Sequence, residues 1–350
     1  MQVFPSKNQF QSNPASASLL ERLLANEQSL GLTGAMLYHS FPLYRDEEGG
    51  VVMADCVLLS QQHGVFTFAL TTESDDLSAS ERQRCLDISE QVPSYVQSRL
   101  VKNRHLRKGP TRLAFEITPV IYAPLLTTTP DVEEVPVVSS DAALVALFQE
   151  RVDPMGDDMF KELIATIEGA KGLIRPKKRE LPDEDTSSKG KQAELVEAAI
   201  TLFDQQQKHG MMGRVTGPQR IRGLAGSGKT VVLAMKAAQA HLQNPDARIA
   251  FTFYTKSLYQ HVKRLITRFY RQFDDRDPNW DKKLFVLHGW GGSGSPGLYS
   301  KACEEHGVAA LSFQQASARS PLDDKFDFAC TSLMSATKIS RLLPGIFDDM

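Results

Sequence analysis

Residues 223–230 read Gly-Leu-Ala-Gly-Ser-Gly-Lys-Thr and satisfy the spacing Gly-x4-Gly-Lys-Thr. The glycines Gly223 and Gly228 let the backbone turn its N–H groups inward around a phosphate, in conformations that a Cβ would resist. A short strand is expected before the loop, at Arg220–Arg222, and an apolar-striped helix after it, at Thr230–Gln243. The N-terminal end of that helix adds partial positive charge, so the segment predicts a phosphate-binding P-loop.

Two side chains of the loop have predicted chemical roles. Lys229 would neutralise the β- and γ-phosphates of a nucleoside triphosphate, and the Thr230 hydroxyl would ligate Mg²⁺. These are the candidate catalytic residues, and the expected cofactors are ATP and Mg²⁺. The other candidate cofactor-binding residues of the loop are Gly223, Ala225, Gly226, Ser227 and Gly228. The alternative is a Gly-rich turn that contains Lys-Thr by chance.

Hydrolysis of a bound triphosphate also needs a strand that ends in Asp, often Asp-Glu, to hold Mg²⁺ and orient water. The segment Lys325-Phe-Asp-Phe-Ala offers one aspartate without an apolar run before it. The last residues, Pro344–Met350, look like the beginning of such a strand. We therefore expect this chain to bind ATP without efficient hydrolysis, as part of an incomplete domain.

From Gln192 onward, predicted helices alternate with predicted strands. Helices are expected at Ala193–Lys208 and Lys256–Phe273, and strands at Arg248–Tyr254 and Leu284–His288. Strands that alternate with helices of this length indicate a parallel sheet with crossover helices. The fold class expected for residues 192–350 is therefore α/β, with helices flanking a parallel sheet.

The first 140 residues are expected to form a smaller mixed α/β domain. Its predicted elements are the helices Ser16–Ser29 and Ser78–Arg99 and the strands Val51–Ser60, Gly64–Leu70 and Leu113–Leu126. Strand-like runs beside helices of this kind are typical of a sheet packed against helices.

A connector is expected between the two halves. Two helical stretches, Asp141–Arg151 and Asp157–Leu173, precede Arg175–Lys191, which is rich in Lys, Glu, Asp, Pro and Ser and poor in apolar residues. This composition is typical of an exposed linker. The predicted division is therefore 1–140, 141–191 and 192–350.

Composition places the chain among ordinary soluble proteins. Hydrophobic residues make up 41% and charged residues 23% of the 350, and the net charge of −2 shows no global basic excess that would indicate nucleic acid. The four cysteines lie far apart without a Cys-x-x-Cys pair, so neither a zinc site nor a disulfide framework is expected. No apolar run approaches the roughly 20 residues that span a bilayer. We expect a cytoplasmic protein of about two domains.

Three further segments accompany the P-loop in a fixed order. Phe203–Gln207 precedes it, and Phe251–Leu258 and Val286–Trp290 follow it. Four segments resemble motifs of UvrD/Rep-like superfamily 1 DNA helicases. Phe203–Gln207 resembles the Q motif, Gly217–Thr230 the Walker A segment, Phe251–Leu258 motif Ia and Val286–Trp290 motif Ib. The resemblance covers Gln192–Met350 and implies a RecA-like first motor domain that couples ATP to movement on single-stranded DNA. The family's Asp-Glu-x-x-Asp/Gln motif and its second RecA-like domain are not found in the sequence.

The same resemblance implies contacts with ligands. Gln207 is expected to read the adenine base. Single-stranded DNA, with RNA left open, is expected to contact Thr252, Tyr254, Thr255, Lys256, His288 and Trp290. Hydroxyls, an amine and helix N-terminal amides suit a phosphate backbone, and the two aromatic rings could stack bases. The alternatives are core packing for Trp290 and a satisfied structural role for His288.

In the N-terminal half, Met53–Ser60 followed by His63–Leu70 resembles nuclease-related domains with a PD-(D/E)xK core. The resemblance implies a restriction-endonuclease-like fold whose first strand supplies a metal-binding aspartate, here Asp55, and whose second strand supplies Glu-x-Lys. The second strand ends in Phe68-Ala-Leu and has neither group. We expect a degenerate, inactive domain that docks DNA or a protein partner, with Asp55 as its remaining candidate metal ligand.

Three functions stay open at this point. The first is an ATP-dependent DNA helicase or translocase, of which this chain would be the N-terminal part. The second is a non-motor ATP-binding module that switches conformation or recruits a partner. The third is a metal-dependent DNA nuclease that uses the N-terminal domain.

Overall fold

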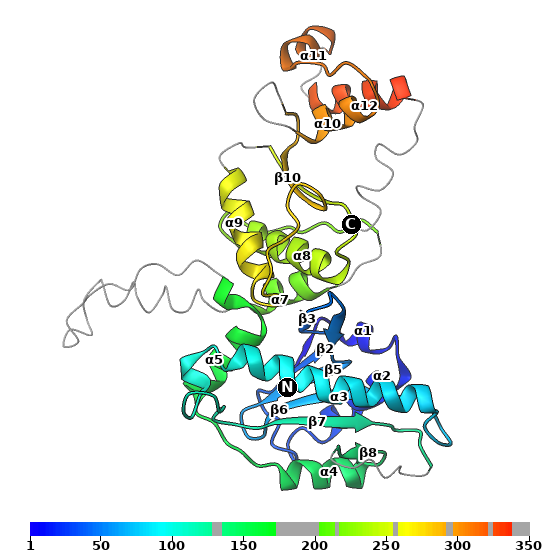
Figure 1. Cartoon of the computed structure of the whole chain (residues 1–350), viewed down its shortest axis with the longest axis vertical. Helices are drawn as coiled ribbons and strands as arrows, with labels where there is room; N and C mark the ends of the chain where they lie inside the picture. The colour runs from blue at the N-terminus through cyan, green and yellow to red at the C-terminus, as the bar shows by residue number, and fades with distance from the viewer. Residues whose placement is uncertain are drawn as a thin grey trace, which may run out of the picture.

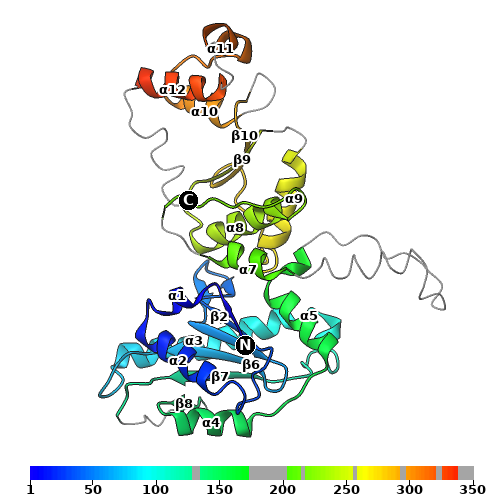
Figure 2. The same ribbon diagram turned by 180° about the vertical axis from the view of Figure 1, so that it is seen from behind.

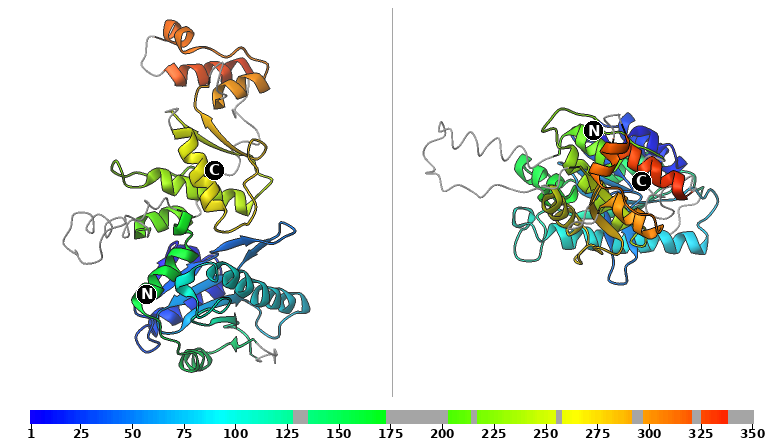
Figure 3. Two further views of the ribbon diagram at one scale, coloured as in Figure 1. Left: turned by 60° about the vertical axis from the view of Figure 1, so that its left-hand side comes forward. Right: turned by 90° about the horizontal axis from the view of Figure 1, so that it is seen from above.

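The chain folds as an α/β protein around a six-stranded mixed sheet. The computed structural model describes residues 1–127, 135–172, 203–213, 217–254, 258–291, 297–320 and 325–337. Figure 1 shows successive layers along the long axis: the large sheet with its helices, then a smaller layer of helices and strands, then a group of helices at the far end. The side view in Figure 3 shows the same order.

The large sheet has the strand order β1 (Gln2–Phe4), β2 (Met36–His39), β5 (Cys56–Ser60), β6 (Gly64–Leu70), β7 (Ile117–Tyr122) and β8 (Val137–Val138). β5 runs antiparallel to β2 and to β6, whereas β1 is parallel to β2, and β7 is parallel to β6 and β8. The connection from β6 to β7 passes through the long helix α3 (Ala79–Leu100), because parallel neighbours need a crossover. This topology confirms the mixed α/β fold expected for the first half of the chain.

Helices cover both faces of this sheet because its central strands send alternate side chains into two cores. Val57 and Leu59 of β5 lie in the core under α3, and Cys56 and Leu58 lie in the core under α2 (Pro14–Ala25). Figure 1 shows α3 in front of the sheet, and Figure 2, from behind, shows α2 in front. The short helix α1 (Lys7–Phe10) and α4 (Asp141–Glu150) pack into the core on the α2 side.

Capping side chains set where the helices begin. Asn13 accepts the N–H of Ala15 at 2.8 Å and stands before Pro14, so α2 begins two residues earlier than its apolar pattern suggested. Ser78 accepts the N–H of Glu81 at 3.3 Å, and α3 begins directly after it. The predicted helix at Ser78–Arg99 is thus confirmed to within one residue at each end.

Two predicted strands are shorter in the structure. The stretch Val51–Ser60 is divided: β4 (Val51–Met53) pairs with β3 (Leu43–Arg45) as a separate hairpin, and only β5 joins the large sheet. The chain bends at Asp55, whose carboxylate accepts the N–H of Leu70 at 2.7 Å. Leu113–Leu126 is a strand only over β7, where β6 provides a partner.

The part of the chain around the predicted P-loop, Gly223–Thr230, which we call the P-loop part, contains a further two-stranded sheet. β9 (Ile249–Phe253) and β10 (Leu284–His288) are parallel and are joined through α9 (Tyr259–Tyr270), while α8 (Lys229–Gln243) follows the P-loop. This pair and its crossover helix confirm the predicted alternation.

The predicted strand at Arg220–Arg222 is wrong. These residues are coil and largely exposed, because β9 pairs only with β10 among the described strands and no described strand lies beside the coil. The helix α7 (Gln205–Met212) precedes the loop in the sequence and overlaps the predicted helix Ala193–Lys208 at residues 205–208. Residues 193–202 and the predicted linker Arg175–Lys191 lie outside the described residues.

One hydrophobic core is shared by the large sheet and the P-loop part. It contains Tyr38 of β2, Met235 of α8 and Phe269 of α9. The connector helix α5 (Asp157–Ile167) adds Leu163 and Ile167 to the same core. Gly169, at a φ of 70°, approaches so closely that an added Cβ would lie 2.9 Å from the ring of Phe273. The connector therefore packs against both the N-terminal part, through α3, and the P-loop part, through α9.

A separate apolar cluster forms beyond β10. It contains side chains of α10 (Leu298–Glu305), α11 (Phe313–Arg319) and α12 (Lys325–Thr337), packed around Trp290. The segment beginning at Lys325, considered above for a catalytic aspartate, is the start of α12 and not a strand. None of the helices in the described ranges is both long and apolar enough to cross a lipid bilayer.

His241 on α8 allows a test of how burial sets stability. Its Nε2 accepts the N–H of Asn279 at 3.1 Å, which requires an unprotonated nitrogen. Burial, aided by the nearby Arg45, lowers the pKa of His241 from 6.5 to about 4. Between these two values the unfolded chain binds more protons than the folded one, so the free energy of unfolding falls as the pH drops.

His241→Gln keeps an acceptor and removes the titration. We expect its free energy of unfolding, measured with urea, to fall less than that of the original protein between pH 6.5 and pH 4. His105→Gln, at an exposed position, is the control and should leave the pH dependence unchanged. Equal pH dependence in the His241→Gln variant and the original protein would contradict the prediction.

Candidate nucleotide-binding site

The P-loop lies between an exposed coil and the N-terminus of α8. Gly226 and Gly228 adopt φ angles of 80° and 78°, in the left-handed region that glycine tolerates without strain. Ser227 N–H donates to Leu224 O at 3.2 Å and closes the turn. No side chain caps the N-terminus of α8, so its first backbone N–H groups stay available to an anion.

Lys229 folds back over the loop. Its ammonium donates to the carbonyl oxygens of Gly223 at 2.9 Å and Leu224 at 2.6 Å. An ammonium group has three donors, so one remains for a phosphate oxygen while both carbonyl contacts persist. The lysine is thus held at the place where the loop would surround a phosphate.

Gln207 is brought to the loop from α7. Asp204 caps this helix, and Gln207 completes a capping box, with its Oε1 accepting the Asp204 N–H at 3.2 Å. Its Nε2 donates to Ser227 O at 3.3 Å, across 20 residues of sequence. Each of these two atoms keeps one further hydrogen-bonding position, a donor and an acceptor side by side.

Thr230 stands in the first turn of α8, half-buried, directly after Lys229. Its hydroxyl is the one protein ligand that the sequence assigned to Mg²⁺. Within the described ranges, no group of three or more His, Cys, Asp or Glu side chains is placed to hold a metal ion. The N–H groups at the start of α8 and the Lys229 ammonium are donors that suit the phosphates of a nucleotide, and the Thr230 hydroxyl is an oxygen ligand of the kind that Mg²⁺ takes.

Leu224 was not selected from the sequence. It is 85% exposed at the tip of the loop, the most exposed of the large apolar side chains in the described residues. The sequence could have indicated this residue, because Leu224 is a large apolar residue among the small residues of a predicted phosphate-binding loop. Its side chain is open to solvent at the tip of the loop.

A large cavity lies next to this site but does not include it. It has a volume of about 980 Å³ and is bordered by His39–Phe41, by the coil at Gln219 and Ile221, by α8 and by β9. None of residues 223–230, all of which are described, lines it. The cavity separates the coil from β9, which agrees with the absence of the predicted strand there.

Two candidate nucleic-acid contacts are exposed at the end of β9. Thr252 is exposed on the strand, and Tyr254, directly after it, is 66% exposed. The Tyr254 ring lies 5.8 Å from the ring of His288, at the corresponding end of β10. Two other candidates, Thr255 and Lys256, lie outside the described residues.

His288 and Trp290 are engaged within the protein. Nδ1 of His288 accepts the N–H groups of Trp290 and Gly291 at 3.1 and 3.2 Å, which leaves Nε2 to donate to Tyr254 O at 2.7 Å. Trp290 is only 8% exposed, and its indole N–H donates to Leu311 O at 3.0 Å.

The predicted stacking role of Trp290 is therefore corrected. The indole face packs in the apolar cluster against Tyr299 and Phe326, with ring centroids 5.7 and 5.6 Å away. A ring enclosed in this way cannot receive a base, and core packing, the alternative considered for it, is what the structure has.

Asp55, the candidate metal ligand, lies at the bend before β5. Its Oδ2 accepts the Leu70 N–H and pairs with Arg84 Nη1 at 3.2 Å. Arg84 also pairs with Glu81 at 2.8 Å, and Glu81 and Asp55 help to raise its pKa. The carboxylate of Asp55 thus has a cationic partner from α3.

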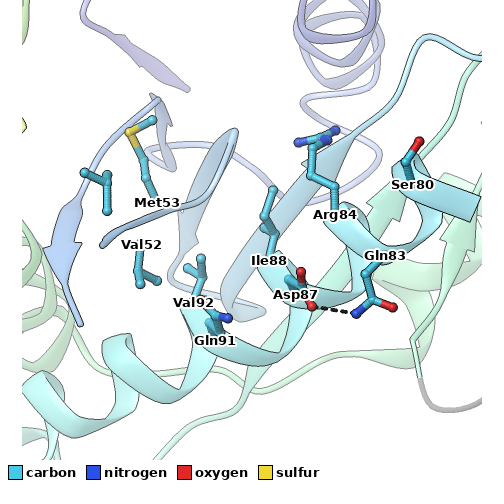
Figure 4. A pocket seen from close by; sticks show the side chains of 10 residues that line it. Val52, Met53, Ser80, Gln83, Arg84, Asp87, Ile88, Gln91 and Val92 are labelled. Carbon is cyan, nitrogen blue, oxygen red and sulfur yellow. Dashed lines mark hydrogen bonds between the residues drawn. The ribbon is translucent and has the colours of Figure 1, made fainter. Parts of the chain in front are cut away.

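A pocket of about 510 Å³ lies beside Arg84, between the strand β4 and helix α3 (Figure 4). Its walls combine apolar side chains of β4 with polar and apolar side chains of α3, namely Val51, Val52, Met53, Ser80, Gln83, Arg84, Asp87, Ile88, Gln91 and Val92. Gln83 donates to Asp87 at 2.7 Å across one helical turn. These two polar side chains of the wall are therefore hydrogen-bonded to each other.

Comparison of the chain with family models, with curated proteins and with solved structures found no match in any of the three. The assignment of a function therefore depends on the residues of the site and on their geometry.

Gly228→Ala tests whether Gln207 depends on the shape of the loop. An alanine Cβ would lie 2.6 Å from Gln207 Nε2. The left-handed φ adds a cost of about 1–2 kcal/mol to folding. We expect a lower free energy of unfolding and, because the Gln207 amide is displaced, roughly tenfold weaker ATP binding by calorimetry, the effect of about one lost hydrogen bond.

Gly34→Ala is the matched control. Gly34 has the same φ of 78°, but an added Cβ there would meet nothing within 4 Å. This variant should lose a similar amount of stability and keep its ATP affinity. If both variants bind ATP equally well, the dependence of Gln207 on the loop is refuted.

Proposed function

We propose that this chain is the ATP-binding part of an ATP-dependent superfamily 1 DNA helicase or translocase. The observation that carries the proposal is the meeting of Gln207 with the P-loop, where its amide donates to Ser227 O at 3.3 Å. The Gln207 amide offers a donor and an acceptor to a base, and the N-terminus of α8 beside it offers N–H groups to phosphates. The order of the motifs in the sequence supports the helicase family over other nucleotide-binding proteins.

Phosphate binding by this loop follows from its charges. The uncapped N-terminus of α8 carries partial positive charge, and the Lys229 ammonium adds a full one. The positive φ angles at Gly226 and Gly228 leave no Cβ between the backbone and an incoming phosphate. Thr230 would add its hydroxyl to a phosphate-bound Mg²⁺, which supplies charge neutralisation when present.

The DNA-facing surface in this proposal is the end of β9. In parallel sheets, ligands bind beyond the carboxyl ends of the strands; Tyr254 lies directly beyond the end of β9, and Thr252 is exposed within its last two residues. An exposed tyrosine ring suits single-stranded nucleic acid, because every base offers a face for stacking. Trp290 has no part in this surface, since its ring is enclosed.

A second function, a non-motor ATP-binding module, is favoured by the sequence after the loop, in which no strand-length apolar run ends in Asp or Asp-Glu. A loop that binds ATP without a hydrolytic carboxylate would act through binding alone, by changing the position of α7 or α8. The two functions differ in whether bound ATP is turned over.

Lys229→Ala tests nucleotide binding. Loss of the ammonium removes a charge-assisted contact to the phosphates, so we expect ATP affinity to fall by about 100-fold or more. Lys282→Ala, at an exposed position before β10, is the control and should bind ATP as the original protein does. An unchanged ATP affinity in the Lys229→Ala variant would refute the assignment of the loop.

An ATPase assay with and without single-stranded DNA separates the two functions. Turnover that rises with DNA, in this chain or a longer form of it, supports the motor. Binding of ATP without turnover in either condition supports the module.

Tyr254→Ala tests the DNA-facing surface. Stacking of one base on an aromatic ring is worth about 1–3 kcal/mol, so we expect roughly 5- to 100-fold weaker binding of a fluorescent oligo(dT) by anisotropy. Phe313→Ala, which removes an exposed aromatic ring from α11, is the control and should leave DNA affinity unchanged. Equal losses in both variants would contradict a specific role for Tyr254.

A further inference from the structure

A buried ionic group lies where three segments of the chain meet. The carboxylate of Glu168, directly after α5, accepts a hydrogen bond from Tyr38 Oη at 2.6 Å and pairs with Lys208 Nζ at 2.8 Å. The side chains of Lys208 and Glu168 are 6% and 0% exposed. Tyr38 belongs to β2 and Lys208 to α7, so this group joins the large sheet to the helix beside the P-loop.

Because this ionic group is buried, its stability depends on the positions of its hydrogen-bond and charge partners. Desolvation raises the pKa of Glu168 despite the attraction of Lys208, and desolvation also raises the pKa of Tyr38. The second carboxylate oxygen, Oε2, is buried and has no hydrogen-bond partner among the described residues. A shift of α7 would separate Lys208 from Glu168 and leave both buried charges without a charged partner, with Tyr38 as the remaining hydrogen-bond donor to the carboxylate.

The helix α7 is held on both sides by consecutive residues. Gln207 contacts the P-loop, whereas Lys208 contacts Glu168. The next residue, His209, bonds to Pro5 O and places its ring 5.0 Å from that of Phe4 on β1. Neighbouring residues of one helix move together, so contacts at 208 and 209 determine where the amide of Gln207 lies.

We propose that Lys208, together with Glu168 and Tyr38, positions Gln207 for recognition of the nucleotide base. The N-terminal sheet thereby sets the base selectivity of the nucleotide site. This inference rests on the proposed function, because it takes Gln207 as the residue that reads adenine. Lys208 is a positioning residue: it acts through Gln207 and touches no part of the nucleotide.

Displacement of Gln207 should weaken recognition of the base and leave the binding of the phosphates unchanged. The phosphate contacts come from the loop N–H groups and from Lys229, whose partners are the Gly223 and Leu224 carbonyls. None of these contacts passes through Lys208. A displaced α7 therefore weakens discrimination between adenine and guanine and leaves the binding of a bare polyphosphate intact.

The experiment measures dissociation constants for ATP, GTP and tripolyphosphate by calorimetry, for the original chain and for Lys208→Met and Tyr38→Phe. We expect the original chain to prefer ATP to GTP. Lys208→Met should reduce that preference by about tenfold, the effect of about one lost hydrogen bond, with tripolyphosphate affinity unchanged. Tyr38→Phe keeps the ion pair and should reduce the preference less.

Loss of stability alone cannot produce this result. A partly unfolded variant binds all three ligands more weakly by the same factor, the fraction folded, so the ratios stay constant. Lys208→Arg restores the cation and should restore the preference. Lys171→Met, which breaks the Lys171–Glu162 pair on the connector, is the matched control and should leave all three affinities unchanged.

The outcomes separate this inference from the function on which it rests. If the original chain prefers ATP and the Lys208→Met and Tyr38→Phe variants keep that preference, the positioning role is overturned and nucleotide binding stands. A chain that binds ATP and GTP equally also overturns it. A chain that binds none of the three ligands overturns the proposed function itself.

Discussion

The buried carboxylate of Glu168 holds the parts of this chain together. A carboxylate removed from water must be paired, and here Lys208 and Tyr38 both bond to one of its oxygens. Removing one partner of such a group typically costs about 3–5 kcal/mol, a large share of the roughly 5–15 kcal/mol that stabilises a domain. The large sheet, the connector and α7 are therefore held in an arrangement in which this charge is paired. The hydrophobic core that they share around Phe269 and Phe273 adds to the same arrangement.

The P-loop owes its shape to backbone constraints of a more local kind. Positive φ angles at Gly226 and Gly228 turn the chain into the N-terminus of α8, and Lys229 is held over the turn by two carbonyls. The opposite end of α8 meets the N-terminal part, where Arg45 donates to Leu242 O and places a cation at the helix C-terminus. α8 thus extends from the candidate phosphate site to the β3–β4 hairpin. Both helices that flank the loop contact the N-terminal part of the chain: α7 through His209 and Pro5, and α8 through Leu242 and Arg45.

Features that depend on local constraints were predictable from the sequence. The glycine spacing predicted the loop, and α8 begins one residue from the predicted start. The strand Gly64–Leu70 was predicted to the residue, because a buried run between turn residues has little freedom. Features that depend on distant partners were not predictable. Arg220–Arg222 would be a strand only beside another strand, and the burial of Trp290 depends on rings contributed by α10 and α12. Lys208 gave no signal, since it stands in a polar stretch and its carboxylate partner, Glu168, comes from the connector.

Two constraints act on Gln207, namely the buried ionic group at Glu168 and the glycine-rich loop. Its backbone is set by the buried group on one side of α7, and its amide meets a loop whose shape is set by glycines on the other. A phosphate that binds the third Lys229 donor leaves the contacts with the Gly223 and Leu224 carbonyls in place, so the turn at Ser227 keeps its shape and Gln207 keeps its bond to it. A movement of α7 would instead separate Lys208 from Glu168 and leave a buried charge unpaired. On the proposed function, the free donor and acceptor of the Gln207 amide are therefore held in place for the base.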